Sequence, residues 1–214
     1  MELKGMKINF LGDSITMGVG ASCNENIFHR VLRDKVGLAD ARNYGISGTR
    51  FALQHNRTQA TYDNNAFTER FESMLDDADA VVVFGGTNDY GHGDAPLGTP
   101  ADRTPETFYG ACHYLFSGLM KKYIGKPIVI MTPLHRTDEC KGTDTPDQSL
   151  KTYVDIIREV AEIYSLPVLD LFKESGMQPL IPENKQLYFV DHVHPNDNGH
   201  AVIAHKLQKF LENL

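Results

Sequence analysis

Four short stretches of this sequence place polar side chains where they could do chemistry. The first, FLGDSITMG at residues 10–18, puts Ser14 directly after an apolar run and a glycine. A serine on a sharp turn from strand to helix can present its hydroxyl and its backbone N–H together, which suits nucleophilic attack and oxyanion binding. Asp13 and Ser14 are also preferred helix N-caps, and the tripeptide alone favours the cap.

A serine nucleophile needs a general base, and the base needs a group that orients it. Asp191 and His194 are three residues apart and precede Pro195, so one local turn could aim the carboxylate at the imidazole. His192 should project differently, and we expect it behind the site or at the surface. The same cluster could instead bind a metal, because His and Asp are common metal ligands.

Two other stretches could supply hydrogen-bond donors. NYGISGT at residues 43–49 contains Gly48, where a backbone N–H could approach a ligand closely, although this stretch alone indicates only a turn. GGTND at residues 85–89 contains Asn88, whose side-chain amide could donate to a developing oxyanion. An Asx-turn is the alternative for Asn88. Hydroxyl and amide groups at these positions suit acyl transfer better than a metal cage.

The elements that must position these residues alternate between strands and helices. Short apolar runs predict five strands, at residues 7–11, 41–44, 80–84, 127–131 and 167–169. Amphipathic periodicity predicts helices at residues 67–75, 104–123, 150–164 and 199–213, the second with Thr104 as N-cap and Pro105 at its first position. This alternation predicts an α/β/α sandwich with a parallel sheet, in which ligands bind at the carboxyl ends of the strands.

Two long loops leave those carboxyl ends, at residues 87–102 and 132–147. Long loops at such positions are often lids or specificity loops. Their polar side chains could bind hydroxyl groups, although most of them should be solvated. These side chains are His92, Asp94, His135, Arg136 and Asp138.

Composition excludes several classes of protein. With 214 residues, 41% hydrophobic and 23% charged, the chain should fold as one domain over residues 1–214. The net charge of −7 and the lack of a Lys/Arg run argue against nucleic acid as a partner. No signal peptide or membrane span is apparent, so we expect a cytoplasmic protein. Cys23, Cys112 and Cys140 form no CxxC pair, which favours incidental thiols.

Together the four stretches resemble one family, the SGNH hydrolases, also called GDSL esterases and lipases. The Gly-Asp-Ser block matches residues 12–14, with Ile15 in place of leucine at the next position. The oxyanion glycine matches Gly48, the Gly-x-Asn-Asp block matches residues 86–89, and Asp-x-x-His-Pro matches residues 191–195. Each block is weak alone, but all four occur in the family's order.

The resemblance implies a flavodoxin-like three-layer fold around a five-stranded parallel sheet, and no cofactor. It implies that Ser14 is the nucleophile, His194 the base and later acid, and Asp191 the orienting carboxylate. The oxyanion would be held by the N–H groups of Ser14 and Gly48 and by the Asn88 side chain. The family's esterases, thioesterases and lysophospholipases are not distinguished by these blocks.

The expected substrate is a small acyl ester, with acetylated carbohydrate as a candidate, since neither long loop offers an apolar surface for a fatty chain. A lysophospholipase or thioesterase of the same family is the alternative. Three other classes compete: a flavin or nucleotide module, a non-catalytic carbohydrate-binding protein, and a metal-dependent phosphoesterase. Residues 18–20 form no phosphate-binding loop, which argues against the first.

Overall fold

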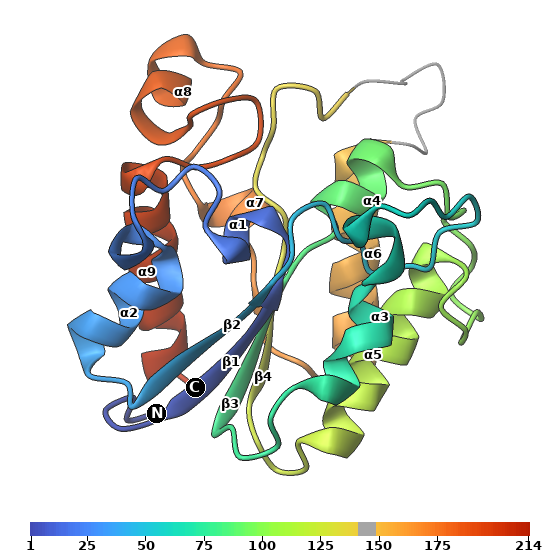
Figure 1. Cartoon of the computed structure of the whole chain (residues 1–214), viewed down its shortest axis with the longest axis horizontal. Helices are drawn as coiled ribbons and strands as arrows, with labels where there is room; N and C mark the ends of the chain where they lie inside the picture. The colour runs from blue at the N-terminus through green and yellow to red at the C-terminus, as the bar shows by residue number, and fades with distance from the viewer. Residues whose placement is uncertain (141–148) are drawn as a thin grey trace.

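The computed structural model describes residues 1–140 and 149–214. Its centre is a parallel sheet of five strands in the order β2-β1-β3-β4-β5 (Figure 1). The strands are β1 (Lys7–Gly12), β2 (Asp40–Gly45), β3 (Ala80–Phe84), β4 (Ile128–Met131) and β5 (Val168–Leu169). This strand order is that of flavodoxin-like folds. The predicted fold class is therefore confirmed.

Helices cover both faces of the sheet (Figure 1). The α-helices are α1 (Ser14–Met17), α2 (Phe28–Val36), α3 (Phe67–Arg70), α4 (Thr87–His92), α5 (Phe108–Lys122), α6 (Leu150–Ile163), α7 (Leu171–Glu174), α8 (Pro182–Tyr188) and α9 (Asp197–Glu212). Short 3-10 helices are η1 (Asn24–Asn26), η2 (Thr61–Asn64) and η3 (Phe71–Ser73). Helices α2 and α9 lie on one face, and α3, α5 and α6 lie on the other.

The core lies in two layers because side chains of a strand alternate between faces. In β3 all five residues are buried, yet Val82 packs into the layer under α2 and α9. Its neighbours Val81 and Val83 pack into the layer under α5 and α6. A strand covered on both faces has no polar alternation, which is why AVVVF was recognisable as a central strand.

Three predicted boundaries need correction. Helix α5 begins at Phe108 rather than at residue 105, because the Thr107 side chain, not Thr104, accepts the capping bond, from the Gly110 N–H at 3.1 Å. The helix predicted at residues 67–75 is α3 followed by η3. The loop predicted at residues 87–102 begins with α4, and part of the loop predicted at residues 132–147 lies outside the described residues.

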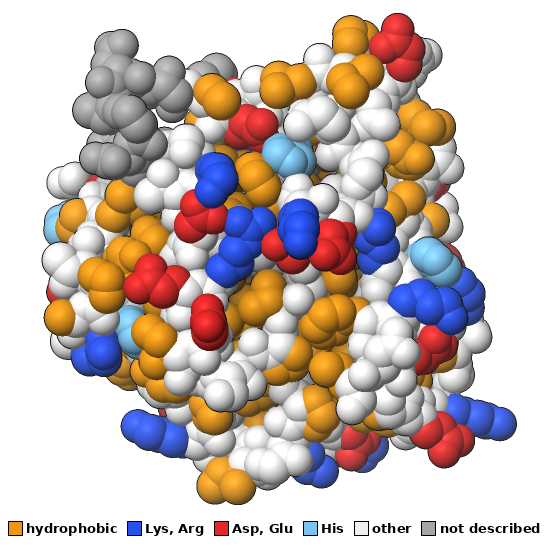
Figure 2. All heavy atoms as spheres, turned by 180° about the vertical axis from the view of Figure 1, so that it is seen from behind, with side chains coloured by type: hydrophobic (Ala, Val, Ile, Leu, Met, Phe, Trp, Pro, Cys, Tyr) orange, Lys and Arg blue, Asp and Glu red, His pale blue; other side chains and the backbone are white. Residues whose placement is uncertain are grey.

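Figure 2 shows the face opposite to that of Figure 1, where acidic and basic side chains are intermixed rather than gathered into one large patch. Within the described ranges, no helix is both long enough and apolar enough to cross a membrane. Cys112 is buried, and Cys23 and Cys140 are exposed free thiols.

Candidate active site

The carboxyl ends of β1, β2 and β3 lie level with one another, since Gly12 pairs with Gly45 on one side and with Phe84 on the other. The sequence-predicted residues of the first three blocks follow directly after these ends. The chain moves from β1 to β2 on one side of the sheet and then to β3 on the other side of β1. This reversal leaves a crevice at the carboxyl ends of β1 and β3. The sheet therefore brings the three blocks to one edge.

Ser14 is the first residue of α1, and Asp13 is its N-cap. The Asp13 carboxylate accepts a hydrogen bond from the Ile15 N–H at 3.0 Å, so the cap does not engage the Ser14 hydroxyl. Gly12 is required before this turn, because a Cβ there would lie 1.9 Å from Oγ1 of Thr16. Ser14 is 5% exposed, and its Oγ remains available to a neighbouring base.

That neighbour is His194, which is 180 residues away in the sequence. Nε2 of His194 lies 2.9 Å from Oγ of Ser14, and Nδ1 lies 2.7 Å from Oδ2 of Asp191. The other carboxylate oxygen of Asp191 accepts from the N–H groups of Val193 and His194, at 2.8 and 2.7 Å. The three side chains thus form a continuous line from carboxylate to hydroxyl, while His192 is exposed.

The Asp191 carboxylate is held in its ionised form. Burial raises its pKa, but the hydrogen bonds from the His194 side chain and from the two N–H groups outweigh burial and lower the pKa to about 2. A charged carboxylate on Nδ1 keeps that nitrogen protonated, so Nε2 faces Ser14 with its lone pair. This tautomer is the one that can take a proton from a hydroxyl.

Asn88 lies in the first turn of α4, next to the end of β3. Its Nδ2 donates to the Thr49 carbonyl at 3.0 Å, and its Oδ1 lies 3.2 Å from Nε2 of His92. Asn88 is 8% exposed, and its bond to Thr49 is buried, whereas its contact with His92 is partly buried. One of the two N–H groups on Nδ2 is left for another acceptor.

Gly48 lies in the loop after β2, next to Thr49. Its φ of +77° is in the left-handed region, and an added Cβ would lie 3.0 Å from Cβ of Tyr62. Glycine is therefore favoured there both by backbone conformation and by space. The Asn88 bond to the Thr49 carbonyl ties this loop to α4.

Two charged residues that were not singled out from the sequence fix these loops: Arg70, which is partly buried, and Asp89, which is buried. The guanidinium of Arg70 donates to the Gly12 carbonyl at 2.6 Å, to Oγ1 of Thr49 at 3.1 Å and to the Tyr44 carbonyl. Asp89 accepts from the N–H groups of residues 51 and 52, both at 3.0 Å. No local pattern signals Arg70, because its partners come from three separate segments.

Burial strongly affects the carboxyl groups next to the site. It raises the pKa of Asp13 to about 6, against the opposing effects of the Ile15 N–H, His194 and Arg70. It raises the pKa of Asp89 to about 6 as well, although two N–H groups solvate that carboxylate. Burial also lowers the pKa of Arg70 to about 10.

A cavity of about 530 Å³ adjoins Gly48. Most of the residues that line it have polar side chains, and Tyr62 adds an aromatic ring. The lining residues are Ser47, Gly48, Arg50, Asn56, Tyr62, Asp63 and His92. The polar side chains of this lining could hydrogen-bond to hydroxyl groups of a ligand.

Of the loop residues expected to bind hydroxyls, His92 lines this cavity. The others are held by protein groups. Asp94 accepts from the N–H groups of residues 55 and 56, Arg136 pairs with Asp138, and His135 lies 2.7 Å from Glu139. Arg136 also donates to the Thr87 carbonyl at 3.0 Å, so it anchors the start of α4.

No group of three or more His, Cys, Asp or Glu side chains that could hold a metal occurs among the residues described. A search of curated proteins finds no match to the chain. The model of the GDSL-like Lipase/Acylhydrolase family, however, matches residues 10–202. The chain belongs to this family. It is a GDSL-like hydrolase, an enzyme that cleaves esters with a serine.

Solved structures resemble this GDSL-like hydrolase over nearly its full length. A protein from Lactobacillus plantarum is 33% identical, with a TM-score of 0.83 over 98% of both chains. An acetyl xylan esterase, AlAXEase, is 24% identical, with a TM-score of 0.67 over 95% of this chain and 98% of its own. A two-domain esterase active on acetylated mannans is 18% identical, with a TM-score of 0.67 over 97% of this chain and 48% of its own.

Proposed function

We propose that this GDSL-like hydrolase cleaves small acyl esters, with acetylated carbohydrate as the substrate class, through an acyl-enzyme on Ser14. The observation that carries the proposal is the 2.9 Å contact between Oγ of Ser14 and Nε2 of His194, with Asp191 on the far nitrogen. Nucleophile, base and orienting group are the parts that serine hydrolysis requires.

In the proposed mechanism, Oγ of Ser14 attacks the ester carbonyl carbon while its proton moves to Nε2 of His194. The charge of Asp191 stabilises the imidazolium that forms. His194 then gives the proton to the departing alcohol, leaving an acyl group on Ser14. A water molecule, deprotonated by His194, attacks the acyl group and releases the carboxylic acid.

The oxyanion of each tetrahedral intermediate is assigned to three donors: the backbone N–H groups of Ser14 and Gly48 and the Nδ2 of Asn88. Supporting this assignment, Asn88 retains an N–H beyond its bond to Thr49, and Ser14 begins a helix. Loss of one such donor typically lowers kcat by about 10²- to 10³-fold. No cofactor is required by these steps.

The polar cavity beside Gly48 supports an alcohol or acid part that carries hydroxyl groups. Two structural neighbours act on acetylated polysaccharides, but at 24% and 18% identity their likeness supports the fold, and the acetyl substrate here is our inference. A lysophospholipase is the second candidate, favoured by exposed apolar side chains near α8. They are Leu180, Ile181, Leu187 and Val190. The cytoplasmic location expected from the sequence stays a prediction.

The first test is hydrolysis of p-nitrophenyl acetate and butyrate by wild type, Ser14→Ala and His194→Ala. Both variants should lose roughly 10⁴-fold or more in kcat, because each removes a group that forms or breaks a bond. A metal chelator should leave wild-type turnover unchanged. Wild-type turnover in both variants would show that the assignment is wrong, and loss on chelation would favour a metal-dependent phosphoesterase.

The substrate class is tested by an ester series from acetyl to octanoyl. We expect kcat/KM to fall steeply after butyryl, because the cavity lining offers polar groups to the substrate. An acetylated xylo-oligosaccharide should be deacetylated in a Ser14-dependent manner. Octanoyl turnover equal to acetyl turnover would favour the lysophospholipase instead.

A further inference from the structure

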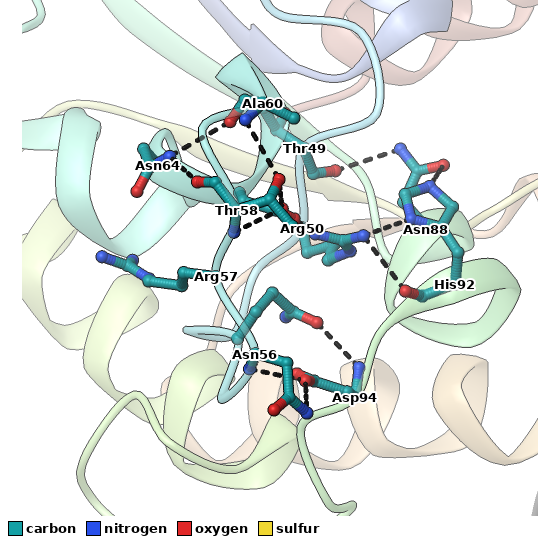
Figure 3. A network of polar contacts seen from close by, with 12 residues as sticks. Thr49, Arg50, Asn56, Arg57, Thr58, Ala60, Asn64, Asn88, His92 and Asp94 are labelled. Carbon is teal, nitrogen blue, oxygen red and sulfur yellow. Dashed lines mark hydrogen bonds and ion pairs between the residues drawn. The ribbon is translucent and has the colours of Figure 1, made fainter.

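A row of polar side chains connects Asn88 through His92 and Arg50 to Asp63. His92 is one helical turn after Asn88 on α4, so the two side chains share a face of the helix. Nε2 of His92 lies 3.2 Å from Oδ1 of Asn88, and Nδ1 of His92 contacts Nη2 of Arg50 (Figure 3). Arg50 in turn pairs with Asp63 at 2.7 Å.

The charged pair at the end of the row is buried, whereas His92 is exposed on one side. Arg50 is 4% exposed and Asp63 5%, which is rare for charged residues unless they are paired. The Thr58 hydroxyl and Arg50 hydrogen-bond to the Asp63 carboxylate and lower its pKa to about 2, so this carboxylate is charged. Arg50 also donates to the His92 carbonyl at 3.0 Å, which holds the end of α4.

The chemistry of the partners fixes the protonation of His92. A guanidinium has donors and no acceptor, so Nδ1 of His92 must offer its lone pair to Arg50. Partial burial of the ring, followed by the charges of Arg50 and Arg136, lowers the pKa of His92 to about 4, so the ring is neutral at pH 7. The single ring proton is therefore on Nε2, directed at Oδ1 of Asn88.

The same reasoning fixes the orientation of the Asn88 amide. The Thr49 carbonyl can only accept, so it must face Nδ2, and the N–H of His92 must face Oδ1. A flipped amide would place its oxygen against the Thr49 carbonyl oxygen and its NH2 group against the N–H of His92. Only one orientation satisfies both neighbours, and it leaves the second N–H of Nδ2 unused.

We infer that His92, oriented by Arg50 and Asp63, is a positioning residue that holds Asn88 as the oxyanion donor. This inference rests on the proposed function, since it requires Asn88 to face an oxyanion. When negative charge forms against Nδ2, the Asn88 amide polarises and its oxygen becomes a better acceptor. The bond from His92 then strengthens in the transition state, which raises kcat rather than substrate affinity.

The test compares His92→Leu, which removes the N–H, with His92→Gln, whose side-chain amide can restore a donor. We expect His92→Leu to lower kcat for p-nitrophenyl acetate by about 10- to 100-fold, with KM changed by less than about 2-fold. His92→Gln should recover most of the loss. The matched control is His205→Leu, an exposed position on α9, which should keep wild-type kcat.

A double-mutant cycle separates positioning from a general structural effect. In an Asn88→Ala background, His92→Leu should change kcat by less than about 2-fold, because the donor that His92 holds is already gone. If the kcat losses of the two single variants multiplied in the double variant, the inference would be overturned. If His92→Leu does not fold, judged by its thermal unfolding, His92→Ala takes its place in the cycle.

The two hypotheses fail differently. Wild-type kcat in His92→Leu, together with an inactive Ser14→Ala, would overturn the positioning role and leave the proposed function intact. Undiminished hydrolysis in Ser14→Ala would overturn the proposed function itself.

Discussion

At the scale of single residues, two neighbours in the turn after β1 make different contacts. Asp13 caps α1 through the Ile15 N–H, and Ser14 keeps its hydroxyl for His194. The local sequence alone favoured a cap and left open which residue provided it. Since the cap is Asp13, the capping and nucleophilic interpretations of this turn do not compete.

The burial of Asp13 leads to a prediction about stability. Its pKa is raised from 3.8 to about 6, so between these pH values the native protein binds more protons here than the unfolded chain does. The contribution of Asp13 to stability therefore falls as pH rises from 4 to 6, and stays low above. Asp13→Asn keeps an oxygen acceptor for the Ile15 N–H but cannot ionise.

Thermal unfolding of Asp13→Asn and wild type across pH 4 to 7 checks this sign. The Tm of the variant relative to wild type should rise by several degrees over that interval. Asp89 is present in both proteins, and the variant loses only the repulsion between Asp89 and an ionised Asp13, which adds to the expected rise. A difference that is flat with pH, or that falls, would contradict the raised pKa.

The candidate residues themselves could be predicted because each lies within a short block that forms a turn, either after a strand or before the last helix. Ser14, Gly48 and Asn88 follow strand ends, Asp191 and His194 lie in the turn before α9, and the roles of all five stay predictions. Arg70 and the row behind Asn88 could not be predicted in the same way. Their partners are brought together by loops, and nothing in the local pattern marks them.

At the scale of elements, the position of His194 depends on contacts between the segment after α1 and the start of α9. Asp197, the first residue of α9, accepts from the Ser22 N–H and hydroxyl at 2.8 and 2.6 Å, and from Asn26 at 2.9 Å. Gly20, in the same segment, approaches the Pro195 carbonyl so closely that an added Cβ would lie 2.2 Å from it. The segment thus sets the distance between Ser14 and His194.

Gly20→Ala should therefore lower kcat by about 10-fold or more, because moving the loop of residues 191–195 displaces His194 from Ser14. Gly125→Ala is the matched control. Both glycines have a positive φ, +94° and +73°, but an added Cβ at Gly125 meets nothing within 4 Å. Thermal unfolding should show a lowered Tm in both variants, because a side chain is strained at a positive φ. Steady-state kinetics should show a loss of kcat only in Gly20→Ala. Equal kcat in the two would refute the role of this contact.

The strands were predicted to within one residue because buried apolar runs in a parallel sheet have a clear signature. Helix α4 was not, since TNDYGH has no apolar periodicity and is held by contacts with other segments, from Arg136 to the Thr87 carbonyl and from the Ala52 N–H to Asp89. The start of α5 was misplaced because Thr104-Pro105 and Thr107 are both plausible caps, and the bond from the Gly110 N–H decides between them.

At the scale of the whole molecule, one edge of the sheet collects the loops after β1, β2 and β3 (Figure 1). The final turn before α9 returns from the end of the chain to complete the group with Asp191 and His194. The fold could be predicted from alternating elements, whereas the polar cavity beside Gly48 could not, because it forms between loops. These levels meet in the proposal that Ser14 is the nucleophile of this ester hydrolase.

The most direct measurement of that claim is covalent labelling with an alkyl p-nitrophenyl phosphonate, followed by intact mass and peptide mapping. Attack of Oγ on phosphorus would expel p-nitrophenolate and leave a stable adduct. The account predicts one adduct per chain, located on Ser14, with loss of p-nitrophenyl acetate hydrolysis, and no adduct on Ser14→Ala. An adduct on another residue, or hydrolysis that survives full modification of Ser14, would contradict it.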